Sequence, residues 1–121
     1  MRLWKYLPLL LLAAPGISHA ANAKHGAMVF LRCAACHNAD KGSGDGLGPN
    51  LFGVVGRKAA SEKGFDYSQA LKKSGITWTN DKLKLWVAHP ARLVPGTQMS
   101  FAGLSNPSDV DDVVAYLDTL K

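Results

Sequence analysis

The segment Cys33-Ala34-Ala35-Cys36-His37 constrains the fold of this chain more than any other. Two residues separate the thiols, so a helical turn of the chain brings both sulfurs to the same side, and a histidine follows directly. Thiols at this spacing can form thioether bonds to the two vinyl groups on one edge of a porphyrin, and the histidine can then ligate the iron. The motif is therefore typical of covalent attachment of one haem c.

The two cysteines have other possible roles. A redox-active dithiol usually occurs near a βαβ pattern, and the sequence contains no such pattern. A structural zinc site needs four ligands, usually from two such pairs, so distant histidines would have to complete it. A disulfide is possible in an oxidising compartment. A haem-free disulfide or zinc protein is therefore the alternative to a haem protein.

Residues 1–20 have the organisation of a secretory signal peptide. A charged start is followed by an apolar run of about eleven residues and by a small-x-small sequence at 18–20. Cleavage is predicted after Ala20, with a cut after Ala23 as the alternative, which leaves one domain over residues 21–121. The apolar run is shorter than the roughly 20 residues that a membrane span needs. We therefore expect an exported, periplasmic protein without stable membrane insertion.

The rest of the chain shows short helical patterns separated by long loops, and no run typical of a strand. Helices are predicted at 24–36, 68–74, 80–88 and from about 106 onward. The stretch 38–56 holds six glycines and a proline, and 91–104 is expected to be irregular. Gly26, in the first helix, is expected to allow close approach of another helix. The pattern predicts an all-α domain whose interior a prosthetic group would fill.

Charge is unevenly distributed along the chain. The formal net charge is +5, and loss of Arg2 and Lys5 with the leader would leave about +3. Residues 24–92 hold eleven Lys and Arg against five acidic residues, whereas the acidic residues dominate from Ser105 onward. This dipolar distribution could orient encounters with an acidic partner protein. Aromatic residues are not interleaved with the basic ones, so nucleic-acid binding is not expected.

Four residues are candidates for a second axial iron ligand. Met28 is too close to the cysteines to reach the opposite haem face and is expected to fill the core, His25 is expected to be solvated, and His89 ends a helix. Met99 lies in the irregular stretch 95–103, which is bounded by Pro and Gly. A loop of this kind can adopt a shape that brings one thioether to a metal. Met99 is therefore predicted to be the second metal ligand, with His37 as the first.

These residues resemble class I cytochromes c, of the mitochondrial and soluble bacterial type, over residues 26–120. The resemblance rests on motifs that follow one another in order. They are the CxxCH segment, Gly48-Pro49-Asn50-Leu51 with Gly53 and Gly56-Arg57, Gly64-Phe65-Asp66-Tyr67-Ser68, Gly75-Ile76-Thr77-Trp78, Pro95-Gly96-Thr97-Gln98-Met99 with Phe101-Ala102-Gly103, and Val113-Val114-Ala115-Tyr116-Leu117. The implied fold is the small cytochrome c fold, with short helices and long loops wrapped around one covalent haem.

The resemblance implies further cofactor-binding roles. The Pro49 carbonyl should accept a hydrogen bond from the outer nitrogen of the histidine ligand, which fixes the ring. Tyr67 and Trp78 should hydrogen-bond a buried haem propionate, with Arg57 near that charge. Two more residues, Thr97 and Phe101, should lie near the inner propionate and at the haem edge, respectively.

The sequence also departs from the pattern of the family. Leu71 and Trp86 fall where many members carry a polar asparagine and a tyrosine, so hydrogen-bond donors are lost beside the haem. The ring of basic residues around the exposed haem edge is thinned, with Ala91 and Gln98 at positions that are often basic. Fewer charges at this edge predict weaker electrostatic steering of a partner, or a different partner.

The implied function is that of a soluble, monomeric, monohaem electron carrier without enzymatic activity. Its partners would be redox proteins, namely an electron-donor complex and a terminal oxidase or reductase, in respiration or photosynthesis. Two alternatives are a dedicated haem subunit of a periplasmic dehydrogenase and a small haem peroxidase or ligand-binding protein in which Met99 is labile.

Overall fold

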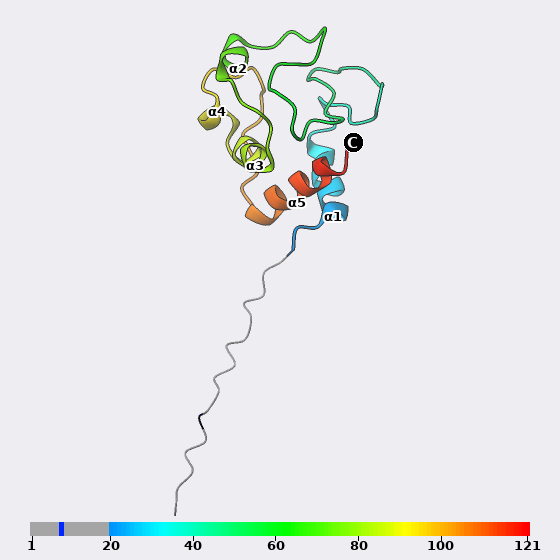
Figure 1. Ribbon diagram of the computed structural model, residues 1–121, viewed down its shortest axis with the longest axis vertical. Coiled ribbons are helices and arrows are strands. Elements are labelled where there is room, and N and C mark those ends of the chain that lie inside the picture. The colour runs from blue at the N-terminus through cyan, green and yellow to red at the C-terminus, as the bar shows by residue number, and fades with distance from the viewer. Residues whose placement is uncertain (1–7, 9–19) are drawn as a thin grey trace, which may run out of the picture.

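The computed structural model describes Pro8 and residues 20–121 (Figure 1). The predicted signal peptide lies outside the described residues, apart from Pro8 and Ala20. In the described part the chain forms α1 (Ala23–Val29), a 3-10 helix η1 (Phe30–Arg32), α2 (Gln69–Ser74), α3 (Asn80–Ala88), α4 (Pro90–Leu93) and α5 (Pro107–Asp118). The only extended pairing in those residues is an isolated bridge between Lys58 and Thr77. The prediction of an all-α domain is confirmed.

The first helix is shorter than the predicted span of 24–36. Asn22 caps α1 by accepting a hydrogen bond from the His25 N–H, and the helix ends at Val29. The chain then tightens into η1, whose end is closed by a bond of 2.8 Å from the Cys33 N–H to the Phe30 carbonyl. Tightening into a 3-10 turn is common at the end of an α-helix. The attachment motif therefore lies in a compact turn that follows the helix.

Helices α1 and α5 cross closely, as the glycine in the first helix predicts (Figure 1). A Cβ added to Gly26 would meet the backbone carbonyl of Asp112 and would lie 2.8 Å from the Cβ of Tyr116. The rings of Phe30 and Tyr116 pack beside this contact, with their centroids 5.2 Å apart. Val113, also on α5, is completely buried. The crossing brings the cysteine-bearing turn against the C-terminal helix.

The remaining helices begin within about one residue of the predicted positions, with one exception. Gly75 ends α2 in the left-handed conformation, with φ of 67°, and Thr79 caps α3. Asn106 caps α5, whose first residue is a proline. The exception is α4, which lies in a segment expected to be irregular. Its first residue is Pro90, and a proline fits the first turn of a helix because its missing N–H has no partner to lose there.

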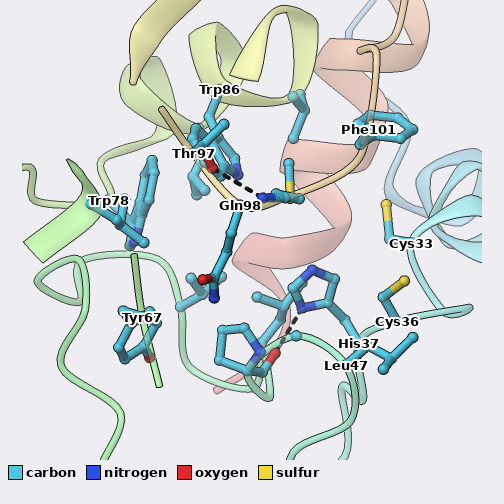
Figure 2. Close-up of a pocket in the computed structure, with 18 of the residues that line it drawn as sticks. Cys33, Cys36, His37, Leu47, Tyr67, Trp78, Trp86, Thr97, Gln98 and Phe101 are labelled. Carbon is cyan, nitrogen blue, oxygen red and sulfur yellow. Dashed lines mark hydrogen bonds between the residues drawn. The ribbon is translucent and has the colours of Figure 1, made fainter. Parts of the chain in front are cut away.

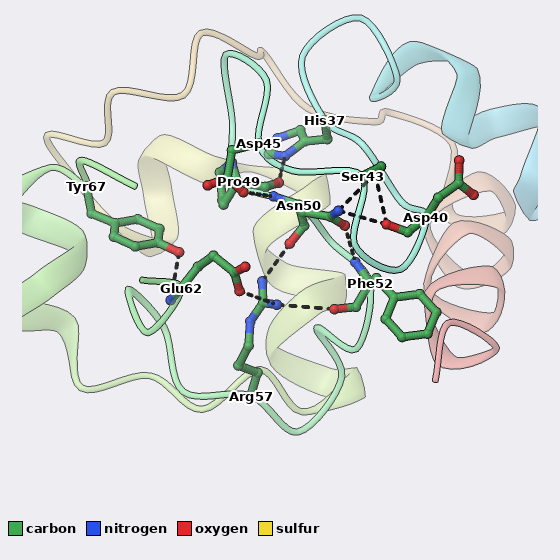
Figure 3. A network of polar contacts seen from close by, with 10 residues as sticks. All are labelled: His37, Asp40, Ser43, Asp45, Pro49, Asn50, Phe52, Arg57, Glu62 and Tyr67. Carbon is green, nitrogen blue, oxygen red and sulfur yellow. Dashed lines mark hydrogen bonds and ion pairs between the residues drawn. The ribbon is translucent and has the colours of Figure 1, made fainter. Parts of the chain in front are cut away.

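The long segment 38–66 has almost no regular structure and is held by side-chain to backbone hydrogen bonds (Figure 3). The buried side chain of Asn50 donates to the Asp40 carbonyl at 2.9 Å and accepts from the Phe52 N–H at 2.9 Å. Its backbone N–H donates to the Asp45 carboxylate at 2.8 Å. Such hydrogen bonds can satisfy backbone groups that a helix or sheet would otherwise pair.

No helix among the described residues is long and apolar enough to cross a membrane.

Candidate haem site

A cavity of about 450 Å³ lies between the attachment turn, the long loop 38–66 and the segment that carries Met99 (Figure 2). Its walls are formed mostly by apolar and aromatic side chains. All ten residues proposed from the sequence line it: Cys33, Cys36, His37, Pro49, Arg57, Tyr67, Trp78, Thr97, Met99 and Phe101. Segments that are far apart along the chain therefore converge on one space.

The two cysteines lie at one side of this cavity, opposite Tyr67 and Trp78 (Figure 2). Cys36 is exposed and Cys33 is half-buried, and they do not form a disulfide. Burial raises the pKa of the Cys33 thiol, although the neighbouring Arg32 cation acts in the opposite direction. The N–H groups of Cys36 and His37 both donate to the Cys33 carbonyl, at 3.1 and 3.0 Å, so the turn closes on itself.

The imidazole of His37 is oriented by the chain that follows it. Its Nδ1 lies 2.7 Å from the Pro49 carbonyl oxygen, the contact that the family resemblance implies for this proline. A carbonyl can only accept, so Nδ1 carries the hydrogen and Nε2 keeps its lone pair for a metal. The ring also rests on Gly48, where an added Cβ would lie 2.7 Å from both ring nitrogens. The space beside the ring exists because residue 48 has no side chain.

The methionine loop, residues 95–103, forms another wall of the cavity, and its neighbours hold its backbone. The Met99 N–H donates to the Thr97 hydroxyl at 3.2 Å, and the Phe101 N–H donates to the Met99 carbonyl at 3.0 Å. The Gln98 side chain reaches the Asp66 carbonyl at 2.9 Å, which ties the loop to the long segment across the cavity. The loop can therefore hold the Met99 thioether in place.

The other three candidate ligands do not line the cavity. Met28 was expected to fill the core, and this expectation is wrong: it is 67% exposed, because its side of α1 faces away from α5. His25 is exposed but hydrogen-bonded, with Nδ1 2.8 Å from a carboxylate oxygen of Asp112. His89 is the exposed C-cap of α3.

Arg57 and Tyr67 belong to one polar network at the edge of the cavity (Figure 3). The Arg57 guanidinium donates to the backbone carbonyls of Asn50 and Phe52, at 3.0 and 3.2 Å, and pairs with Glu62 at 3.2 Å. The Tyr67 hydroxyl accepts from the Glu62 N–H at 3.1 Å, which leaves its own hydrogen free to donate. Burial raises the pKa of Tyr67, so the hydroxyl stays protonated.

Asn50 and Glu62 organise this network, and no role is predicted for either of them from the sequence. A signal was present in the first case, because an asparagine after a Gly-Pro pair is typical of a hydrogen-bonded turn. For Glu62 the sequence offers no comparable signal. Its contacts depend on the path of a loop without regular structure.

The residues present fit a covalently held haem. Two thiols at one side of an apolar cavity are suited to the attachment bonds, and an imidazole with its lone pair free and a thioether on another wall are donors of the types that bind haem iron. Within the described residues there is no group of three or more His, Cys, Asp or Glu side chains that could hold a metal ion by themselves. The two thiols, the imidazole and the thioether around the cavity favour a porphyrin iron.

Comparisons with known proteins agree with this donor set. The family model described as cytochrome c matches residues 23–121. Cytochrome c2 of Rhodoblastus acidophilus is 48% identical over 96 residues, which cover 79% of this chain and 90% of the relative. Cytochrome c of Arabidopsis thaliana is 42% identical over 103 residues, which cover 84% of this chain and 92% of the relative.

Among solved structures, cytochrome cH from Methylobacterium extorquens superimposes with a TM-score of 0.77 at 49% identity. The match covers 82% of this chain and 99% of that structure. The residues matched by the family model include the attachment turn and the methionine loop. The chain therefore belongs to the cytochrome c family, as a class I c-type cytochrome with covalently attached haem c.

Proposed function

We propose that this protein carries single electrons between redox complexes, with haem c bonded to Cys33 and Cys36 and ligated by His37 and Met99. The observation that carries the proposal is that all four side chains line one apolar cavity. When bound, the haem supplies an iron that alternates between Fe(II) and Fe(III). The protein's part is to hold that iron in one environment in both states.

The two axial residues act differently. The hydrogen bond from His37 Nδ1 to the Pro49 carbonyl fixes the ring and makes its other nitrogen a stronger donor. The Met99 thioether favours Fe(II) relative to a second imidazole and so raises the reduction potential. If His37 and Met99 both bind the iron, no site would remain open for peroxide or a gas, which favours a carrier over an enzyme.

The far side of the cavity is suited to haem propionates. We assign the free hydroxyl hydrogen of Tyr67 and the indole N–H of Trp78 as donors to a propionate, with Thr97 and Phe101 completing the walls. The Arg57 guanidinium already binds loop carbonyls and Glu62. We therefore assign it to neutralising negative charge at this edge of the cavity and to holding the loop. Leu71 and Trp86 also line the cavity.

We infer that the signal peptide is cut after Ala20 rather than after Ala23, and that the protein works in the periplasm. Asn22 caps α1, and its backbone N–H donates to Asp112 of α5 at 2.8 Å. A cut after Ala23 would remove both contacts, and loss of an N-cap alone costs about 1 kcal/mol. The intact mass of the exported protein distinguishes the two cuts by the masses of residues 21–23.

The ferric visible spectrum of the exported protein tests the ligation. Methionine bound to haem iron gives a weak charge-transfer band at the red end of the spectrum, and Met99→Ala should abolish it while mass spectrometry still finds the haem attached. Met28→Ala is the matched control and should keep the band, because Met28 lies outside the cavity. A wild-type protein that lacks the band and binds cyanide rapidly would instead be a ligand-binding or peroxidatic haem protein.

The other alternative is a dedicated subunit of a dehydrogenase. Such a subunit would remain bound to its enzyme through purification at high salt. A freely diffusing carrier forms small, short-lived interfaces and should elute alone. Size-exclusion chromatography of the native protein at high ionic strength separates the two cases.

A further inference from the structure

Glu62 is an acidic residue that contacts the wall of the cavity without lining the cavity itself (Figure 3). Its carboxylate oxygen Oε2 lies 3.2 Å from the guanidinium of Arg57, which does line the cavity. Among the described residues this is the only hydrogen bond or ion pair that the Glu62 side chain makes. The carboxylate therefore has no other partner in the described chain than the cation at the cavity edge.

Arg57 keeps its place at this edge through contacts that do not involve Glu62. Its guanidinium donates to the backbone carbonyls of Asn50 and Phe52, at 3.0 and 3.2 Å. The Arg57 side chain is only 20% exposed, so water screens its charge less than that of a surface arginine. The positive charge thus remains beside the cavity whether or not a carboxylate stands at position 62.

The charge of Glu62 also reaches a second residue of the cavity wall, Tyr67. Burial raises the pKa of Tyr67, and the carboxylates of Glu62 and Asp45 act in the same direction. The hydrogen bond that the Tyr67 hydroxyl accepts comes from the backbone N–H of Glu62, not from its side chain. A change of the Glu62 side chain would therefore alter the charge at this edge and leave the backbone donor to Tyr67 in place.

We propose that the Glu62 carboxylate lowers the reduction potential of the bound haem by offsetting the positive charge of Arg57 at the propionate edge of the cavity. The inference rests on the proposed electron-transfer function. Reduction of the iron from Fe(III) to Fe(II) adds one electron and so removes one positive charge from the site. A nearby negative charge disfavours this step, and a nearby positive charge favours it. Glu62 supplies the negative charge and offsets the positive one, so both effects lower the potential.

Two variants separate the charge of Glu62 from its shape. Glu62→Gln keeps the length of the side chain and an oxygen that can accept from Arg57, but it carries no charge. Glu62→Asp keeps the charge on a shorter side chain. In potentiometric titrations of the haem-loaded protein, Glu62→Gln should raise the equilibrium constant for reduction about threefold, or roughly 28 mV at about 59 mV per tenfold. Glu62→Asp should stay close to the wild-type value.

The difference between Glu62→Gln and wild type should shrink as the ionic strength rises from about 10 to 300 mM, because salt screens a partly exposed charge. Asp111→Asn is the matched control: Asp111 is also an ion-paired carboxylate, 3.4 Å from Lys84, and it does not line the cavity. This variant removes the same charge and should leave the potential unchanged.

An unchanged or lower potential in Glu62→Gln overturns the proposal. An equal rise in Glu62→Asp overturns it as well, because it would show that Glu62 acts by holding the loop rather than by its charge. Both results would leave the protein a working electron carrier. A haem-loaded wild type that does not take up and release one electron reversibly would overturn the proposed function itself.

Discussion

The imidazole of His37 contacts two consecutive residues, Gly48 and Pro49. Its Nδ1 lies 2.7 Å from the Pro49 carbonyl oxygen, and its ring packs against Gly48. The first contact sets which nitrogen carries the hydrogen, and the second sets where the ring can lie. Gly48 is itself tied to the attachment turn through the Cys36 carbonyl. The His37 imidazole, its hydrogen-bond acceptor and the cysteine turn are therefore connected to one another.

Gly48→Ala should displace the His37 ring. The added Cβ would lie 2.7 Å from both ring nitrogens, closer than any ordinary contact, and the backbone at Gly48 is otherwise unstrained. Overpacking of this kind costs about 1–3 kcal/mol, so the free energy of unfolding should fall by that amount. The visible spectrum of the haem-loaded protein should change as well, because the displaced ring is the proposed iron ligand.

Gly42→Ala provides the control for Gly48→Ala. Residue 42 has φ of 76° in open space, so the new methyl group adds only backbone strain of about 1 kcal/mol. Guanidinium unfolding should show this loss, and the spectrum should stay unchanged. Equal spectra for both variants would contradict the role assigned to Gly48.

Gly26→Ala should destabilise the protein, although the same change stabilises most helices by roughly 0.5–1 kcal/mol. Its Cβ would collide with the Asp112 carbonyl and approach the Tyr116 Cβ, which forces α1 and α5 apart. We expect a loss of about 2–3 kcal/mol in chemical denaturation. Ala27→Gly, at the adjacent half-exposed position, should cost only about 1 kcal/mol. A more stable Gly26→Ala protein would show that the helices do not cross at this residue.

The sequence predicted most reliably those features that local chemistry determines. The positions of α2, α3 and α5 and the close approach at Gly26 follow from residues within a turn of the feature. The position of Met28 was predicted wrongly, because it depends on which side of α1 meets α5. The length of the first helix was also predicted wrongly, because the chain tightens into η1 after Val29. The convergence of the ten site residues on one cavity came from the family motifs, because no local pattern encodes a loop path such as 38–66.

Ala60→Gly should stabilise the protein. Ala60 has φ of 59°, the only non-glycine residue of the described chain with positive φ. The left-handed conformation costs roughly 1–2 kcal/mol for a residue with a Cβ, and glycine removes this cost. Glycine also has greater conformational freedom in the unfolded chain, which offsets part of the stabilisation. The net increase in unfolding free energy should reach up to about 1 kcal/mol. Ala59→Gly, at a buried neighbour with negative φ, should instead lower it, and a loss in both variants would show that Ala60 is not strained.

Tyr67→Phe should change how stability depends on pH. Burial raises the pKa of Tyr67 in the folded protein, whereas the unfolded chain keeps the ordinary value of about 10. The folded state therefore holds the phenolic proton more tightly than the unfolded chain does. The stability that follows from this difference is fully present below about pH 10 and is lost as pH rises through the folded pKa. The variant also loses the hydrogen bond from the Glu62 N–H, worth about 1 kcal/mol at neutral pH. Denaturation between pH 7 and 11 should show a constant gap between wild type and variant up to about pH 9 and a shrinking gap above it. A gap that stays constant to pH 11 would show that the Tyr67 hydroxyl is as solvated in the folded protein as in the unfolded chain.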